Sequence, residues 1–146
     1  FLLNPLAELV AYLEKIRASL GPDGMVFMDC YGGWEAQQLV EEPRLVETDK
    51  GDFTYSWEQA AFNPLTNVTR CHIHFELAGG KKLKKAFTYE WRLYTPAEVR
   101  DALLAAGFSR ATVYWDVSPD EDEDIFKAVA KAENTAGWLA YIVGEV

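Results

Sequence analysis

Three residues that could do chemistry lie at the end of a short apolar run. The run Met25–Tyr31 contains Asp29 and Tyr31, and Trp34 follows the pair Gly32-Gly33. If this run is a strand of an open α/β sheet, its carboxyl end lies where such sheets place their reaction sites. We therefore predict Asp29 and Tyr31 as catalytic residues and Trp34 as a substrate contact. Asp29 could accept a proton or orient an amine; alternatively, it only satisfies N–H groups of the following turn.

Two histidines stand two positions apart in an alternating segment, so they share one face of a strand. His72 and His74 could together begin a zinc site, but zinc needs a third and usually a fourth protein ligand. Arg70 shares their face and would repel a cation. We therefore predict no metal site, and we assign His74 to a polar face that is either solvated or lines a substrate pocket.

Trp57 and Arg92 are further candidates for substrate binding, each in an alternating segment. Arg92 could hold a substrate carboxylate through the two-pronged hydrogen bonding that guanidinium favours. The simpler interpretation is that Glu58, Glu90 and Arg92 form ion pairs between neighbouring strands. Both interpretations of Arg92 remain open.

Hydrophobic periodicity predicts the elements that must position these residues. A helix over 4–20 is capped by Asn4, and four consecutive apolar residues predict a strand over 25–31 that is buried on both faces. Thr95-Pro96-Ala97-Glu98 is a capping box that opens a helix ending at Gly107. Residues 34–52 are expected to be irregular, and the acidic run 120–124 to lead into a short helix. The other expected strands are 53–58, 70–77 and 86–93, which form an antiparallel meander, and 112–117 and 138–143. We expect one domain, residues 1–146.

Composition excludes several classes of function. The net charge is −9, so the chain lacks the basic surface that binding to nucleic acid requires. The lysines between 81 and 85 flank Gly79-Gly80 and are expected at a solvated hairpin tip. No apolar run is long enough to span a membrane. Cys30 and Cys71 lie in apolar segments, which indicates buried free thiols and a cytoplasmic protein.

The order of these segments resembles the C-terminal half of a class I S-adenosylmethionine-dependent methyltransferase of the small-molecule group. Three segments carry the resemblance: Leu20-Gly-Pro-Asp-Gly24 before the strand ending Asp29-Cys-Tyr-Gly-Gly33, the strand Phe87–Leu93, and Tyr94-Thr-Pro-Ala-Glu-Val-Arg100 leading to Ala105-Ala-Gly-Phe108.

The resemblance implies a fold class and a cofactor. The fold would be α/β, a partial doubly wound, Rossmann-like sheet with the three-stranded meander inserted. Residues 25–31, 112–117 and 138–143 would be its fifth, sixth and seventh strands, with the seventh antiparallel between the other two. The cofactor would be S-adenosylmethionine, beside Phe1 and Leu2. The family's glycine-rich turn has no counterpart here, since Gly32-Gly33 follows a different strand, so we expect the chain alone to bind the cofactor weakly and to be inactive.

We therefore predict methyl transfer to a small molecule by a larger enzyme of which this chain is part. The alternatives are a non-catalytic module that binds a small ligand on its aromatic-lined sheet, and a self-associating structural remnant. Without a fourth strand beside residues 25–31, that strand would expose an unpaired edge. We accordingly expect a homodimer or higher oligomer built around residues 1–31.

Overall fold

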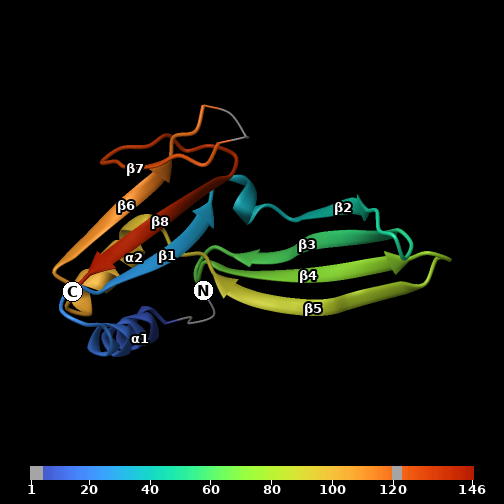
Figure 1. Cartoon of the computed structure of the whole chain (residues 1–146). Helices are drawn as coiled ribbons and strands as arrows, with labels where there is room; N and C mark the ends of the chain where they lie inside the picture. The colour runs from blue at the N-terminus through green and yellow to red at the C-terminus, as the bar shows by residue number, and fades with distance from the viewer. Residues whose placement is uncertain (1–4, 120–122) are drawn as a thin grey trace. The chain divides into compact units, whose positions relative to one another are not determined.

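The structure is a computed structural model that describes residues 5–119 and 123–146. The chain folds into two compact units (Figure 1). The first comprises residues up to Ala36 together with Leu93–Val146, and the second comprises Gln37–Arg92. The expectation of a single domain over residues 1–146 stays a prediction.

The sheet of the first unit has the strand order β1-β8-β6-β7. β8 (Trp138–Glu145) pairs antiparallel with both β1 (Met25–Gly32) and β6 (Arg110–Asp116), so β1 and β6 run parallel to each other. The predicted place of residues 138–143, antiparallel between the two other strands, is confirmed. The short β7 (Phe126–Ala128) pairs with β6, in place of the helix expected after the acidic run, of which residues 120–122 lie outside the described part.

Two helices pack on this sheet. α1 (Leu6–Ser19) follows Pro5, which provides no side-chain cap, and the predicted cap Asn4 lies outside the described residues. α2 (Pro96–Ala105) begins with the predicted capping box: the Glu98 N–H donates to the Thr95 hydroxyl at 3.2 Å, and the Thr95 N–H donates to the Glu98 carboxylate at 2.9 Å. This reciprocal pair satisfies two N–H groups that a helix start leaves without partners.

Both helices contribute to one hydrophobic core. Leu9 and Leu13 of α1 and Leu103 of α2 are fully buried with Ile142 of β8. The core residues of β1 and β8 are Met28, Cys30, Ala140 and Ile142. These positions alternate along their strands, so the helices cover a single face of the sheet.

The opposite face of this sheet carries no helix of the described chain. Phe27 lies on that face and is 65% exposed, so the prediction that β1 is buried on both faces is wrong. The burial of β1 alternates because core-facing Met28 and Cys30 are its only buried residues. The architecture is mixed α/β; the doubly wound arrangement, which has helices on both faces, is not confirmed.

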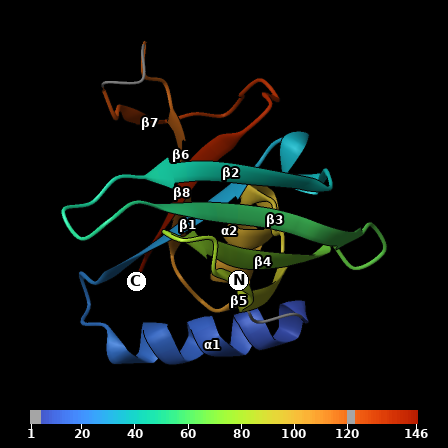
Figure 2. The same cartoon turned by 90° about the vertical axis from the view of Figure 1, so that its right-hand side faces the viewer.

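The second unit is one antiparallel sheet of four strands in the order β2-β3-β4-β5, side by side in Figures 1 and 2. β3 (Phe53–Asn63), β4 (Val68–Leu77) and β5 (Lys82–Arg92) are the predicted meander. β2 (Val40–Val46) was not predicted, because Pro43 suggested an irregular segment. β2 is an edge strand, where a proline without an N–H group is tolerated.

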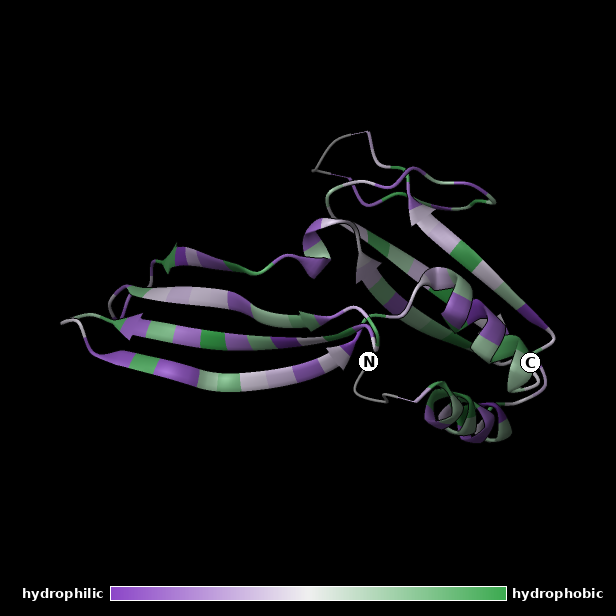
Figure 3. Ribbon diagram, turned by 180° about the vertical axis from the view of Figure 1, so that it is seen from behind, coloured by the Kyte–Doolittle hydropathy of each residue, from purple (hydrophilic) through white to green (hydrophobic). Residues whose placement is uncertain are grey.

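The alternation predicted for this sheet is confirmed by strand register, and along β4 it is visible as bands of opposite hydropathy in Figure 3. Cross-strand register places Tyr55 opposite Phe75 and Ile73 opposite Phe87, which gives one aromatic face. The rings contact one another in pairs, for example Trp57 and Trp91 with centroids 5.8 Å apart. The pairs of this aromatic face are Phe53–Phe75, Tyr55–Phe75, Trp57–Trp91, Phe75–Phe87 and Tyr89–Trp91.

Candidate functional site

The residues predicted from sequence divide between the two units. Asp29 and Tyr31 lie at the carboxyl end of β1 with Trp34 just beyond, whereas Trp57, His74 and Arg92 belong to the second unit. Asp29 is exposed and Tyr31 half-buried, and the Trp34 ring is 52% exposed. Phe1 and Leu2, the predicted cofactor contacts, lie outside the described residues. The chemical roles of all these residues stay predictions.

The glycine pair at the end of β1 allows two segments of the backbone to approach each other closely. A Cβ atom on Gly32 would overlap the ring of Trp138, and one on Gly33, where φ is +109°, would overlap the carbonyl of Ala136. The Glu35 N–H donates to that same carbonyl at 3.0 Å. Gly32 and Gly33 therefore let two loops of the first unit meet, and they leave no open cradle for a phosphate or a nucleoside.

A second carboxylate stands at the carboxyl end of β6, which runs parallel to β1. Asp116 accepts a hydrogen bond from the Ser118 N–H at 2.9 Å and another from the Ser118 hydroxyl. These bonds lower the pKa of Asp116. Asp116 was not among the residues predicted from sequence, although an aspartate two residues before a serine is typical of a side-chain turn. Its hydrogen bonds to Ser118 stabilise this turn, and this structural role is enough to account for an aspartate at position 116.

The two cysteines are buried and free, as predicted. Burial in the core, followed by the nearby charge of Asp29, raises the pKa of the Cys30 thiol to about 12. Burial also raises the pKa of Cys71. Because the thiolate is the reactive form, neither residue is suited to be a nucleophile.

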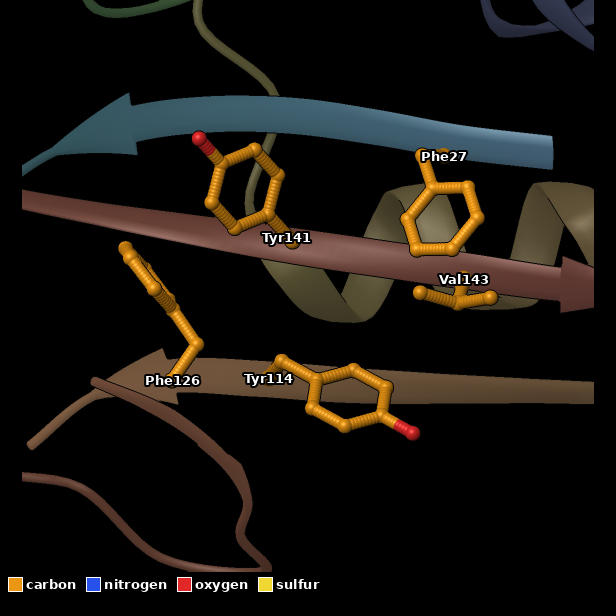
Figure 4. A pocket seen from close by; sticks show the side chains of 5 residues that line it. All are labelled: Phe27, Tyr114, Phe126, Tyr141 and Val143. Atoms are coloured by element: carbon orange, nitrogen blue, oxygen red, sulfur yellow. The ribbon is translucent and has the colours of Figure 1, made fainter. Parts of the chain in front are cut away.

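The uncovered face of the first unit contains a cavity of about 280 Å³. Figure 4 shows rings from several strands around it, with the hydroxyl groups of Tyr114 and Tyr141 at opposite ends. The rings of Phe126 and Tyr141 meet edge to face, with centroids 4.6 Å apart. The lining consists of Phe27, Tyr114, Phe126, Tyr141 and Val143. Apart from the two phenol hydroxyls its lining is apolar, so this cavity is suited chiefly to binding apolar surface. This cavity was not predicted from sequence, because the continuous apolar runs of β1 and β8 do not reveal which residues share a face.

The polar face of the second unit holds the histidines. His72 Nδ1 lies 2.8 Å from the Thr88 hydroxyl. His74 uses both ring nitrogens: Nε2 lies 2.8 Å from the Glu58 carboxylate, and Nδ1 accepts the Lys85 N–H at 3.0 Å. A direct hydrogen bond from His74 to a substrate would have to displace one of these partners. Within the described residues, no group of three or more His, Cys, Asp or Glu side chains is arranged to hold a metal ion.

Cross-strand ion pairs account for much of the remaining charge on this face. Arg70 and Glu90 face each other on β4 and β5, and Arg70 Nε donates to Glu90 at 2.8 Å. Lys82 lies 3.1 Å from Glu76. Glu90 thus pairs across strands as expected, with Arg70 as its partner.

No helix in the described ranges is long and apolar enough to cross a membrane.

The fold is shared with solved structures, two of which are described as methyltransferases. No family model and no curated protein matches the sequence. DesVI from Streptomyces venezuelae matches 98% of this chain with a TM-score of 0.67 and 21% identity. The CcbJ methyltransferase from Streptomyces caelestis matches 97% with a TM-score of 0.60 and 18% identity. CalS10 from Micromonospora echinaspora, an amino pentose methyltransferase with bound S-adenosylmethionine, matches 97% with a TM-score of 0.59 and 16% identity. The chain spans about half the length of these proteins, 52%, 55% and 52% respectively.

Proposed function

We propose that this chain takes part in S-adenosylmethionine-dependent methyl transfer to a small molecule, as one half of a larger enzyme. The observation that carries the proposal is the match of nearly the whole chain to two structures described as methyltransferases, with 97% of it aligned to CcbJ at a TM-score of 0.60 and 97% to CalS10 at 0.59. The description of CalS10 as a methyltransferase acting on an amino pentose, with S-adenosylmethionine bound, suggests the cofactor and an amine-bearing sugar as acceptor.

The described residues do not fit the cofactor by themselves. Their glycine pair, Gly32-Gly33, is occupied by the approach of residues 135–138, and no other glycine-rich turn follows a strand of the first unit in the described ranges. The cofactor would therefore be held chiefly by another part of the enzyme. Asp29 and Tyr31 would lie at the carboxyl ends of the parallel strands β1 and β6, where open α/β sheets bind their ligands.

Methyl transfer depends mainly on alignment of the nucleophile, with little covalent help from the protein. In the proposed enzyme Asp29 orients the acceptor or takes a proton from it, and Tyr31 shapes the pocket. Trp34, just beyond the same strand end, contacts the acceptor. Within the second unit, Arg92 and His74 lie on the polar face and Trp57 lies on the opposite, aromatic face, so the sheet separates Trp57 from the other two. Asp29 is suited to its role because it is exposed at a strand end and no hydrogen bond from the described residues ties its carboxylate to a turn.

Two features of the first unit favour a further protein segment beside it. β1 ends the strand order, so its outer edge pairs with no other described strand. The face with the apolar cavity is also uncovered, with Phe27 65% exposed. An unpaired edge and an apolar patch both favour association. The cofactor-binding half of the enzyme would cover them; a second copy, giving a homo-oligomer through residues 1–31, is the alternative.

Calorimetry and an activity assay together test this proposal. We expect the 146-residue chain to show no tight binding of S-adenosylhomocysteine. The native gene product should transfer a labelled methyl group from S-adenosylmethionine to an amino sugar. Tight, stoichiometric binding by the chain alone would show that it needs no second half, and a native product that binds no cofactor would overturn the proposed activity.

Light scattering separates the two partners proposed for the uncovered surface. A second copy predicts a particle of at least twice 16.5 kDa at high protein concentration. A 16.5 kDa monomer would refute the homo-oligomer and leave the second half of the enzyme as the proposed partner.

The second candidate function is a non-catalytic module that binds a small ligand. It is favoured by the aromatic face of the second unit, where Trp57 and Trp91 are only half-buried and Phe87 is 52% exposed. Quenching of tryptophan fluorescence by an aromatic or sugar ligand, in a native gene product without affinity for S-adenosylmethionine, would support this candidate over the first.

A further inference from the structure

Strand register places four glutamates on the polar face of the second unit: Glu41, Glu58, Glu76 and Glu90. Glu76 pairs with Lys82, and Glu90 pairs with Arg70. Glu58 lies directly opposite His72 across β3 and β4, but its hydrogen bond is to His74 one step along the strand. Among the described residues, Glu58 is thus the glutamate of this face whose partner is an imidazole and not a lysine or arginine.

The hydrogen bonds of His74 define its charge. Its Nδ1 accepts the Lys85 N–H at 3.0 Å, so Nδ1 carries no proton in this arrangement. The proton of the ring is then on Nε2, which donates to Glu58 Oε2 at 2.8 Å. The imidazole is neutral, and the negative charge of Glu58 is not compensated by it.

The backbone holds this arrangement in place. Lys85 has a φ of +52°, a conformation that side chains other than glycine seldom adopt. The pairing of β4 with β5 shifts register between Ile73 and Phe75, which places His74 at the irregularity. Bulges of this kind redirect side chains. Here the irregularity lets the Lys85 N–H reach His74, and His74 in turn fixes one oxygen of Glu58.

The carboxylate is sheltered but reachable, since the side chains of His74 and Glu58 are 17% and 30% exposed. Partial burial strengthens an electrostatic interaction with a ligand relative to one in bulk water. A metal ion is a poor occupant, because both nitrogens of His74 are used and no third ligand is at hand in the described chain. An organic ammonium group needs only a negative charge and hydrogen-bond acceptors.

We propose that Glu58, oriented by His74, binds the protonated amine of a small molecule. The ammonium group donates to Oε1, the oxygen that His74 leaves unused, and no covalent bond changes. This binding requires neither cofactor nor methyl transfer, so it stands apart from the proposed function.

Nuclear magnetic resonance titration of the chain with D-glucosamine at about pH 7, where amines of this kind are largely protonated, tests the proposal. The amide of Lys85 is the reporter because it bonds directly to His74. We expect saturable shifts at that amide with a Kd on the order of millimolar. D-Glucose and N-acetyl-D-glucosamine, which lack the ammonium charge, should produce none.

Two matched variants assign the charge. Glu58→Gln keeps the size of the side chain and an oxygen that accepts the His74 bond, and it should weaken D-glucosamine binding by about ten- to hundredfold. Glu90→Gln removes an equivalent charge from the same face and should leave binding unchanged. Equal affinity of Glu58→Gln and the unchanged chain, no binding by the unchanged chain, or equal binding of D-glucose would each overturn the proposal. Because no cofactor is present, an inactive native enzyme would not affect this result.

Discussion

Replacing Gly144 by alanine should destabilise the first unit, because this strand position has no room for a methyl group. The added Cβ atom would lie 2.8 Å from Leu103 Cδ2, 3.1 Å from Phe108 Cδ1 and 3.2 Å from Val26 Cγ1. Carbon atoms at optimal separation are about 3.5–4.0 Å apart, so all three neighbours must move. Leu103 is fully buried and Phe108 is 3% exposed, so neither can turn towards solvent.

The expected size of the effect follows from two opposing contributions. Overpacking in a close-packed core typically costs about 1–3 kcal/mol. Replacing glycine in a strand returns about 0.5–1 kcal/mol, because the unfolded chain loses freedom. Taking the middle of each range, we expect a net loss of about 1.2 kcal/mol in the free energy of unfolding. With a urea slope of about 2 kcal/mol/M, the midpoint should fall by roughly 0.6 M.

Gly137→Ala is the matched control, since a Cβ atom there meets nothing within 4 Å. Urea unfolding followed by circular dichroism should give the control a midpoint equal to or slightly above that of the unchanged chain. A Gly144→Ala midpoint as high as that of the control would refute the packing of α2 and the segment after it against β8.

Two further predictions concern other parts of the chain. Trp91→Ala should lower the free energy of unfolding by about 2–3 kcal/mol, because Trp91 is half-buried and contacts Trp57 and Tyr89. Replacing a fully buried ring would cost more, roughly 3–5 kcal/mol. Leu65→Ala, at a position 94% exposed, is the control, and equal urea midpoints for the two variants would contradict the aromatic face. The buried Cys30 thiol has a pKa raised from 9.0 to about 12, so its contribution to stability is fully present below pH 9.0 and is lost as the pH rises towards 12. In Cys30→Ala the urea midpoint should therefore decrease less between about pH 9 and pH 12 than in the unchanged chain. An equal decrease in both would show that other groups cause the loss of stability.

Local patterns in the sequence determined much of the fold. The capping box at Thr95 specifies the start of α2 because all its partners lie within one turn of chain. Strict alternation in β3, β4 and β5 specified the aromatic and polar faces, since a strand's side chains point to opposite sides in turn. The order and direction of β1, β8 and β6 followed from the resemblance to methyltransferases and were confirmed.

Other features were decided only by tertiary structure. Pro43 lies in a strand because β2 happens to be at the edge of its sheet, which the local sequence does not reveal. The continuous apolar run of β1 predicted burial on both faces, yet burial depends on which elements cover each face, and both helices cover the same one. The bond between Glu58 and His74 depends on strand register and on the irregularity near Lys85. Residues far apart in sequence make these contacts, so their geometry depends on how the whole chain pairs and packs.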